Sequence, residues 1–103
     1  MDEYSKAHRE AVATGKYWIL VVTEDWCPAC KSLKQGLASH LKNKDVIITY
    51  LSRDNKYAKQ IAGDRIPHWF IWKYDSVNEK FKVLHEEVGS SNLKYTLNRI
   101  VKK

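Results

Sequence analysis

Two cysteines, Cys27 and Cys30, are the only thiols in this 103-residue chain, and Pro28 and Ala29 separate them. A Cys-x-x-Cys spacing places a nucleophilic thiolate and a second thiol within one helical turn. The first thiolate can attack a disulfide, and the second can then attack the mixed disulfide that forms. The spacing therefore predicts thiol–disulfide exchange, with Cys27 as the nucleophile and Cys30 as the resolving thiol.

The residues on either side of the pair favour a reactive Cys27. An uninterrupted apolar run over residues 17–22 is typical of a strand buried on both faces, and Pro28 suits the first position of a helix. Cys27 is therefore expected at the helix N-cap, where free backbone N–H groups and the helix dipole stabilise a thiolate. Lys31 favours that thiolate, whereas the acidic residues at positions 24 and 25 oppose it.

Three other roles for the cysteine pair compete with redox chemistry. A structural disulfide that closes so short a loop would stabilise the fold little, and cytosolic thiols are usually kept reduced. A structural zinc ion needs four ligands, and the histidines do not follow zinc-finger spacings. The four histidines of the chain are His8, His40, His68 and His85. Two buried, inert cysteines are the third alternative. The position of the pair between a strand and a helix favours redox chemistry, and we expect neither a metal nor a cofactor.

The apolar periodicity predicts one α/β domain over residues 1–103. Expected helices cover residues 2–14, 28–41, 54–62 and 91–103, and expected strands cover 17–22, 46–51, 68–72 and 80–85. Residues 75–78 are expected to turn the last two strands into a hairpin. The order α-β-α-β-α-β-β-α predicts a central four-stranded mixed sheet with helices on both faces.

Composition narrows the function classes. A hydrophobic fraction of 44% is enough for a packed core, and no apolar run approaches the roughly 20 residues that a membrane span needs. The first residues lack the pattern of a signal peptide, so we expect a cytoplasmic monomer, although a processed chain would look the same. The net charge of +6 is spread along the sequence, and we interpret it as a solvated surface rather than a nucleic-acid footprint.

Over nearly its whole length the chain resembles the thioredoxin superfamily. The resemblance rests on Trp26-Cys27-Pro28-Ala29-Cys30-Lys31, the Ile66-Pro67 step and Val88-Gly89. It implies a thioredoxin fold that lacks the family's first strand, with a cis peptide bond before Pro67. It also implies that the backbone of Ile66 pairs with an extended substrate segment.

The same resemblance indicates a substrate-binding surface. Its candidates are the residues next to the cysteines and in the two later motifs, namely Trp26, Pro28, Ala29, Ile66, Pro67 and Gly89. For Gly89, an ordinary loop glycine is the simpler alternative. Trp69 either joins Trp26 in an apolar groove or packs in the core, where Trp18 and Trp72 are expected. His68 either lies near the disulfide, where its charge favours the thiolate, or is a surface residue without a role.

The chain also departs from the family pattern. Pro-Ala replaces the usual Gly-Pro between the cysteines, which is closer to glutaredoxins and to oxidising periplasmic enzymes. Val21 occupies the position of the family's buried aspartate, and Tyr50 that of the accompanying lysine. Proton transfer at Cys30 is therefore expected to use water or a neighbour such as Glu24.

The resemblance implies a thiol–disulfide oxidoreductase that acts on protein disulfides. Its electron donor would be a thioredoxin-reductase-like enzyme or glutathione, and the sequence leaves the direction of electron flow open. One alternative is a glutathione-dependent, glutaredoxin-like enzyme, although Ile66 replaces that family's threonine and its Gly-Gly-x-Asp pattern is reduced to residues 89–92. The other alternative is a binding module that uses the fold to hold a protein partner.

Overall fold

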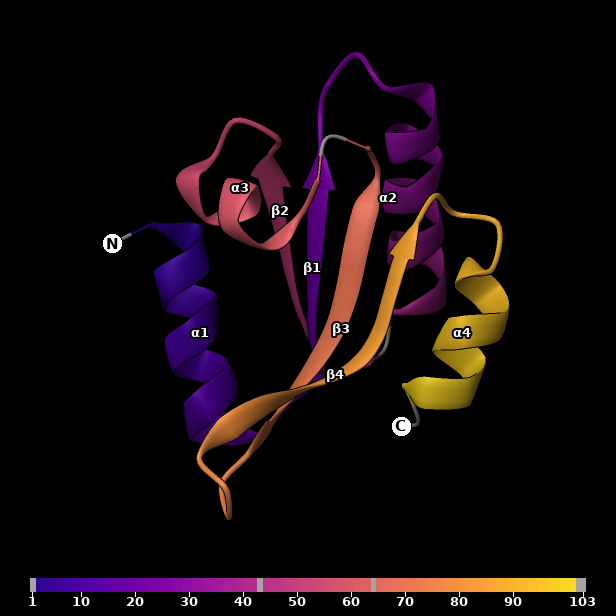
Figure 1. The fold of residues 1–103 in the computed structure, drawn as a ribbon. Helices are drawn as coiled ribbons and strands as arrows, with labels where there is room; N and C mark the ends of the chain where they lie inside the picture. The colour runs from indigo at the N-terminus through magenta and orange to yellow at the C-terminus, as the bar shows by residue number, and fades with distance from the viewer. Residues whose placement is uncertain (1, 43, 64, 102–103) are drawn as a thin grey trace.

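A computed structural model describes residues 2–42, 44–63 and 65–101. Helices and strands follow one another in the predicted order, as Figure 1 shows. They are α1 (Glu3–Thr14), β1 (Trp18–Thr23), α2 (Pro28–His40), β2 (Ile47–Ser52), α3 (Lys56–Ile61), β3 (His68–Asp75), β4 (Lys80–Val88) and α4 (Leu93–Ile100). The prediction for the last helix included residues 102–103, which lie outside the described residues. Both strands of the hairpin are longer than predicted, because their cross-strand pairs continue to Asp75 and Lys80 at one end and to Val88 at the other.

The four strands form one mixed sheet in the order β2-β1-β3-β4. Strand β1 is parallel to β2 and antiparallel to β3, and β3 is antiparallel to β4. All six residues of β1 are buried, which explains why its sequence is an almost uninterrupted apolar run. The register pairs Val22 with His68, so the end of β1 that leads to Cys27 lies beside the start of β3, next to Pro67.

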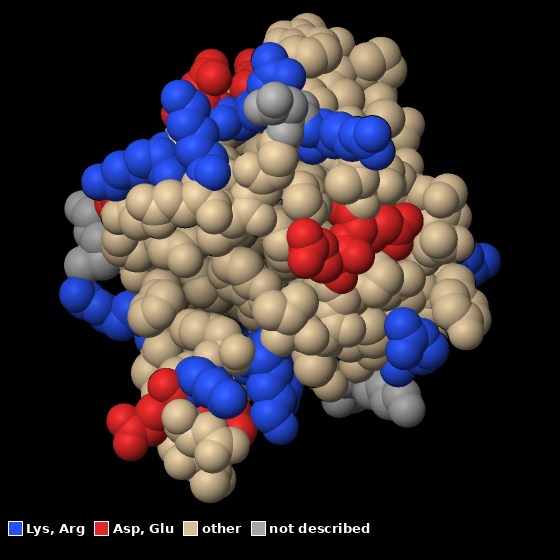
Figure 2. All heavy atoms as spheres, viewed as in Figure 1, with Lys and Arg blue, Asp and Glu red and all other residues tan. Residues whose placement is uncertain are grey.

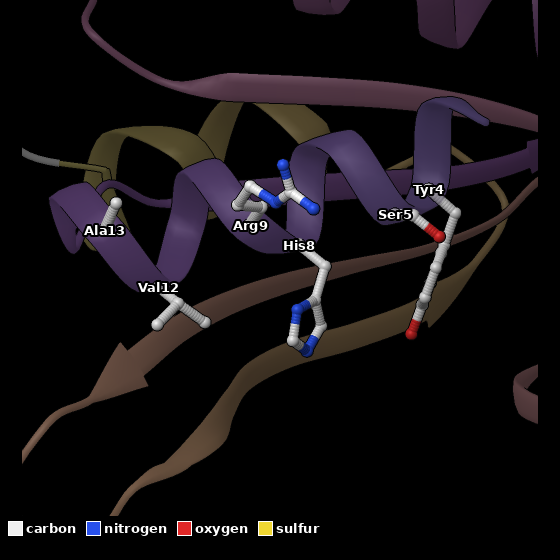
Figure 3. A pocket seen from close by; sticks show the side chains of 6 residues that line it. All are labelled: Tyr4, Ser5, His8, Arg9, Val12 and Ala13. Atoms are coloured by element: carbon white, nitrogen blue, oxygen red, sulfur yellow. The ribbon is translucent and has the colours of Figure 1, made fainter. Parts of the chain in front are cut away.

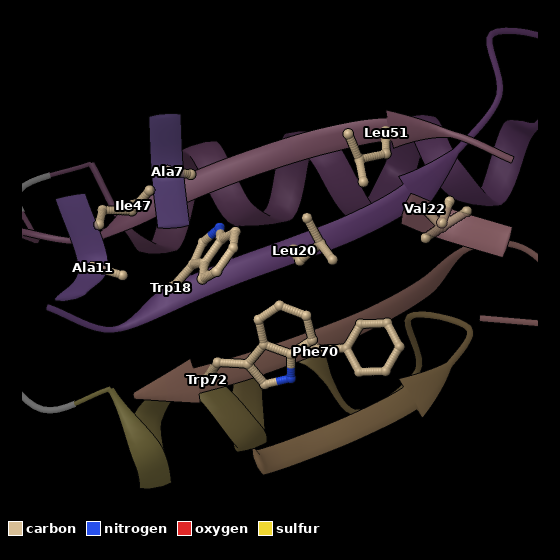
Figure 4. Packing of buried hydrophobic residues seen from close by; sticks show 10 residues of the cluster. Ala7, Ala11, Trp18, Leu20, Val22, Ile47, Leu51, Phe70 and Trp72 are labelled. Carbon is tan, nitrogen blue, oxygen red and sulfur yellow. The ribbon is translucent and has the colours of Figure 1, made fainter. Parts of the chain in front are cut away.

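Helices cover both faces of the sheet (Figure 1). One face packs against α1 and α3 through a cluster that includes Ala11, Trp18 and Phe70 (Figure 4). The other face packs against α2 and α4 through a cluster that includes Val21, Leu33 and Leu97. Alternate residues of β1 serve the two clusters, as the two-residue period of a strand requires. The cysteines therefore lie on the helix layer that covers the second face.

A glycine sets how closely α2 and α4 approach each other. A Cβ atom at Gly36 of α2 would collide with the side chain of Leu93, the buried first residue of α4. The absence of a side chain at Gly36 therefore allows the C-terminal helix to pack directly on the helix that begins with the cysteine pair.

Charge is distributed over the surface, and no described helix could cross a membrane. In Figure 2, basic side chains occupy several separate places on the face shown, with acidic groups between them. Within residues 2–42, 44–63 and 65–101, no helix is both long enough and apolar enough to span a bilayer.

Candidate active site

Cys27 is the N-cap residue of α2, as the sequence predicts. Its backbone is extended, Pro28 is the first helical residue, and its sulfur accepts a hydrogen bond from the backbone N–H of Cys30 at 3.2 Å. Both cysteines are free thiols and both are buried. An N–H group at the positive end of the helix dipole stabilises negative charge on sulfur, so this geometry favours a Cys27 thiolate.

Cys30 lies one turn further along and is the more deeply buried of the two thiols. Burial raises the pKa of the Cys30 thiol, because it removes the thiolate from water, and Cys27 raises it further. The side chain of Thr23 and the backbone of Glu24 act in the opposite direction and lower that pKa. The two thiols therefore differ in their surroundings: the Cys27 sulfur accepts a backbone hydrogen bond at the start of the helix, whereas burial disfavours charge on Cys30.

The segment that precedes β3 carries the predicted cis bond, between Ile66 and Pro67. The backbone N–H of Gly89 donates a 2.8 Å hydrogen bond to the carbonyl oxygen of Pro67. Gly89 has a φ of 97°, a backbone conformation that favours glycine, and its carbonyl accepts a 2.8 Å bond from the indole of Trp69. Gly89 therefore has a conformational requirement, and it links the start of β3 to the end of β4.

The predicted substrate-binding residues around the cysteines are accessible. Trp26 is 65% exposed, and both Pro28 and Ala29 are exposed at the start of α2. The guanidinium carbon of Arg53 lies 5.6 Å from the centre of the Trp26 ring, a cation–π contact. The surface beside Cys27 therefore combines an indole and a positive charge.

Trp69 does not line a groove, and that alternative is wrong. It is fully buried in the cluster under α2 and α4, where its indole reaches Gly89 and its ring lies 5.0 Å from that of His85. Core packing, the other alternative for Trp69, is confirmed, as is the expectation that Trp18 and Trp72 are core residues.

Neither interpretation of His68 agrees with the structure. Its side chain is buried, it stacks on Phe70 with ring centres 4.7 Å apart, and its Nε2 lies 2.9 Å from a carboxylate oxygen of Glu86. Residues 68 and 70 share one face of β3, which is the face covered by α1 and α3. His68 therefore lies on the side of the sheet opposite α2 and is not a surface residue.

The carboxylate of Glu24, a candidate for proton transfer at Cys30, makes hydrogen bonds to another strand. One oxygen of its carboxylate accepts hydrogen bonds from the Ser52 hydroxyl and the Arg53 backbone N–H, both at 3.0 Å. These bonds hold the carboxylate at the end of β2, whereas the backbone of Glu24 interacts with Cys30. The residue that the sequence prediction missed is Thr23, a buried side chain that lowers the pKa of the Cys30 thiol.

A cavity of about 690 Å³ lies on α1, away from the cysteines. Figure 3 shows its lining side chains, all from this helix: Tyr4, Ser5, His8, Arg9, Val12 and Ala13. None of them is a thiol or a carboxylate, and α1 covers the face of the sheet opposite α2. This cavity therefore supplies no group for disulfide chemistry. Among the described residues, no three His, Cys, Asp or Glu side chains are grouped to hold a metal ion.

A four-stranded mixed sheet with a Cys-x-x-Cys pair at the start of the helix after its central strand places this chain in the class of thioredoxin-like folds. Comparison with solved structures supports this fold. Thioredoxin of Trichomonas vaginalis has a TM-score of 0.72 and 23% identity over 92% of this chain and 86% of its own. A thioredoxin of Thermus thermophilus has a TM-score of 0.73 and 19% identity over 96% and 85%. Plasmodium falciparum thioredoxin has a TM-score of 0.74 and 13% identity over 92% and 80%.

No protein-family model matches the chain, and no curated protein matches it by sequence. The structural likeness, at identities below 25%, establishes the fold. The predicted thioredoxin fold is thus confirmed, and the Cys-x-x-Cys pair within it is consistent with an oxidoreductase.

Proposed function

We propose that the chain is a thiol–disulfide oxidoreductase that exchanges electrons with protein disulfides. The observation that carries this proposal is the hydrogen bond from the Cys30 N–H to the Cys27 sulfur at the start of α2. It supports one thiolate that is ready to attack and a second, buried thiol one turn away.

The reaction consists of two displacements at sulfur. The Cys27 thiolate forms a bond to one sulfur of the substrate disulfide, and the other substrate sulfur leaves as a thiolate that takes a proton from water. Cys30 then loses its proton to water and attacks the Cys27 sulfur, which displaces the second substrate thiolate. The substrate gains two electrons, and the cysteine pair becomes a disulfide that an external donor must reduce.

The substrate would lie across the exposed residues around Cys27. Trp26, Pro28 and Ala29 offer apolar surface on the cysteine side, and the half-buried Ile66 offers backbone on the other. Pro67 is buried, and both backbone groups of Gly89 are already hydrogen-bonded, so these two residues shape the surface rather than pair with the substrate. A Cβ atom at Gly89 would meet no other atom, which leaves space for an approaching chain. We infer that the protein acts as a monomer on extended protein segments that contain a disulfide.

Reduction of insulin, with dithiothreitol as the regenerating reductant, tests the proposal. We expect Cys27→Ser to lower turnover to the rate of dithiothreitol alone, because the attacking sulfur is gone. In a separate reaction without dithiothreitol, Cys30→Ser should instead trap a stoichiometric mixed disulfide with insulin, which dithiothreitol added afterwards releases. If both variants keep full turnover, the cysteines are incidental, and the binding-module alternative takes the place of the enzyme.

The electron donor can be identified separately. Turnover supported by NADPH and a thioredoxin reductase would be compared with turnover supported by glutathione and its reductase. We expect the flavoenzyme to be the better donor, since Ile66 replaces the threonine expected of a glutathione-binding protein. A faster reaction with glutathione would favour the glutaredoxin-like alternative.

A further inference from the structure

The resolving thiol needs a means of ionising inside the protein. Cys30 is buried, and burial raises its pKa. At the position where the thioredoxin resemblance implies a carboxylate, the chain has the apolar Val21, which is fully buried. The carboxylate of Glu24, which the sequence suggested for proton transfer, is held by Ser52 and Arg53. The thiolate of Cys30 therefore has to be stabilised by another group.

Thr23 is a buried hydroxyl group with unused hydrogen-bonding capacity. It is the last residue of β1, its side chain is 7% exposed, and its Oγ1 makes no hydrogen bond within the described residues. A buried hydroxyl without a partner costs free energy, so its retention next to a reactive group calls for an explanation. Thr23 lies on the same face of β1 as Val21, which is the face that α2 covers. From there its side chain lowers the pKa of the buried Cys30 thiol of that helix.

We propose that the Thr23 hydroxyl is the hydrogen-bond donor that stabilises the Cys30 thiolate while the mixed disulfide is resolved. This inference rests on the proposed function. In the dithiol state the hydroxyl has no partner, and when Cys30 ionises, the O–H donates to the negative sulfur. A donor fixed in place before charge develops is worth more than one that must reorganise. The bond is needed from the ionisation of Cys30 until its sulfur bonds to Cys27.

The surroundings of Thr23 provide an exit for the proton. Two adjoining cavities of about 310 Å³ and 320 Å³ share Thr23, Glu24, Asp25 and Lys34 among their lining residues. Each is far larger than the space that one water molecule needs. The step therefore balances within the protein and its solvent: Cys30 gives its proton to water, and the thiolate keeps the electron pair that attacks Cys27.

Other titratable groups near this site also influence the ionisation of Cys30. The Cys27 thiol lies at the start of the same helix, two carboxylates and two ammonium groups line the cavities, and β2 contributes a phenol whose pKa is raised by burial. They are Glu24, Asp25, Lys31, Lys34 and Tyr50. A variant of Thr23 leaves all of them in place, so its effect reports on the hydroxyl.

The reaction of the reduced protein with Ellman's disulfide separates the two cysteines. In the first phase, Cys27 attacks the reagent and releases one thionitrobenzoate. In the second phase, Cys30 attacks the mixed disulfide on Cys27, releases the second thionitrobenzoate and leaves the Cys27–Cys30 disulfide. Stopped-flow absorbance gives both rates, and the second phase measured from pH 6 to pH 10 reports the ionisation of Cys30.

We expect Thr23→Val to slow the second phase by about tenfold at pH 7, the size of a charge-assisted hydrogen bond. Its midpoint should move to higher pH, and the difference should shrink as the pH rises, because every Cys30 is then ionised. Thr23→Ser keeps the hydroxyl and should restore the wild-type profile. Thr96→Val, at a buried threonine of α4, is the matched control and should change neither phase.

Two results would overturn the inference: a second phase unchanged by Thr23→Val at every pH, or one slowed equally at every pH and not restored by Thr23→Ser. If Thr23→Val does not fold, as judged by circular dichroism, Thr23→Ala carries the same comparison. If the wild-type protein shows no second phase at all, the proposed function itself is refuted. The two failures are therefore distinguishable.

Discussion

The hydrogen bond from Trp69 to Gly89 makes a specific contribution to stability that can be separated from the packing of the indole. Trp69→Phe removes the N–H donor of a fully buried side chain and leaves a small cavity under α2 and α4. A net hydrogen bond contributes about 0.5–1.5 kcal/mol. The missing part of the ring adds about 1–2 kcal/mol through lost burial and the cavity. We therefore expect a loss of roughly 2–3 kcal/mol from the free energy of unfolding.

Trp72→Phe provides the matched comparison. Trp72 is 9% exposed, belongs to the cluster on the opposite face and makes no hydrogen bond through its indole within the described residues. The same truncation there should cost about 1–2 kcal/mol. The difference of about 1 kcal/mol between the two variants is the contribution of the bond to Gly89.

Urea unfolding followed by far-ultraviolet circular dichroism measures both variants, because a change in tryptophan content alters fluorescence. For a domain of this size each kcal/mol corresponds to roughly 4–8 °C, so Trp69→Phe should lower Tm by about 10–20 °C. Equal losses for Trp69→Phe and Trp72→Phe would refute the reasoning, since the hydrogen bond would then contribute nothing. Because Gly89 also holds Pro67, we expect Trp69→Phe to raise the KM for insulin as well.

Three further outcomes follow from the structure. The indole of Trp18 donates to the buried Thr49 hydroxyl at 3.0 Å, so Thr49→Val should cost about 1–3 kcal/mol in urea unfolding and Thr49→Ser clearly less. Gly89→Ala places a side chain at a φ of 97° and should lower the free energy of unfolding by about 1–3 kcal/mol. A variant as stable as the wild-type protein would contradict the strain argument. The raised pKa of Cys30 favours its protonated form in the folded state, so its contribution to stability is present below the ordinary thiol value of 9.0 and is lost as the pH rises through the folded value. Urea titrations from pH 7 to pH 11 should therefore show a steeper alkaline loss for the reduced protein than for its Cys30→Ser variant, and parallel curves would contradict this assignment.

The fold could be predicted because its main signals are local. The run over residues 17–22 contains no polar residue, which is typical of a strand covered on both faces, and the structure places β1 at Trp18–Thr23. The N-cap role of Cys27 follows from Pro28, since proline lacks the N–H that a first helical residue would leave unpaired. These features depend on a few neighbouring residues.

The features that the sequence did not predict depend on which face of the sheet a side chain occupies and on whether α2 covers that face. The run over residues 68–72 is apolar at nearly every position, so its two-residue period does not indicate which side α2 covers. The sequence therefore leaves the faces of His68 and Trp69 undecided, and the structure places the two side chains on opposite faces. The burial of Thr23 likewise arises when α2 folds over the end of β1, and the bond from Ser52 to Glu24 joins residues that are 28 positions apart in the chain.

The attachment of the cysteine turn to β1 has a consequence for the lifetime of the protein. All six residues of this central strand are buried, and the fold described above contains both cysteines as free, buried thiols. Buried central strands open mainly through global unfolding, whereas helix ends open locally. Proteases cleave opened chains at a rate that follows the population of the open form. The reduced form and a form with a Cys27–Cys30 disulfide should therefore be degraded at similar rates.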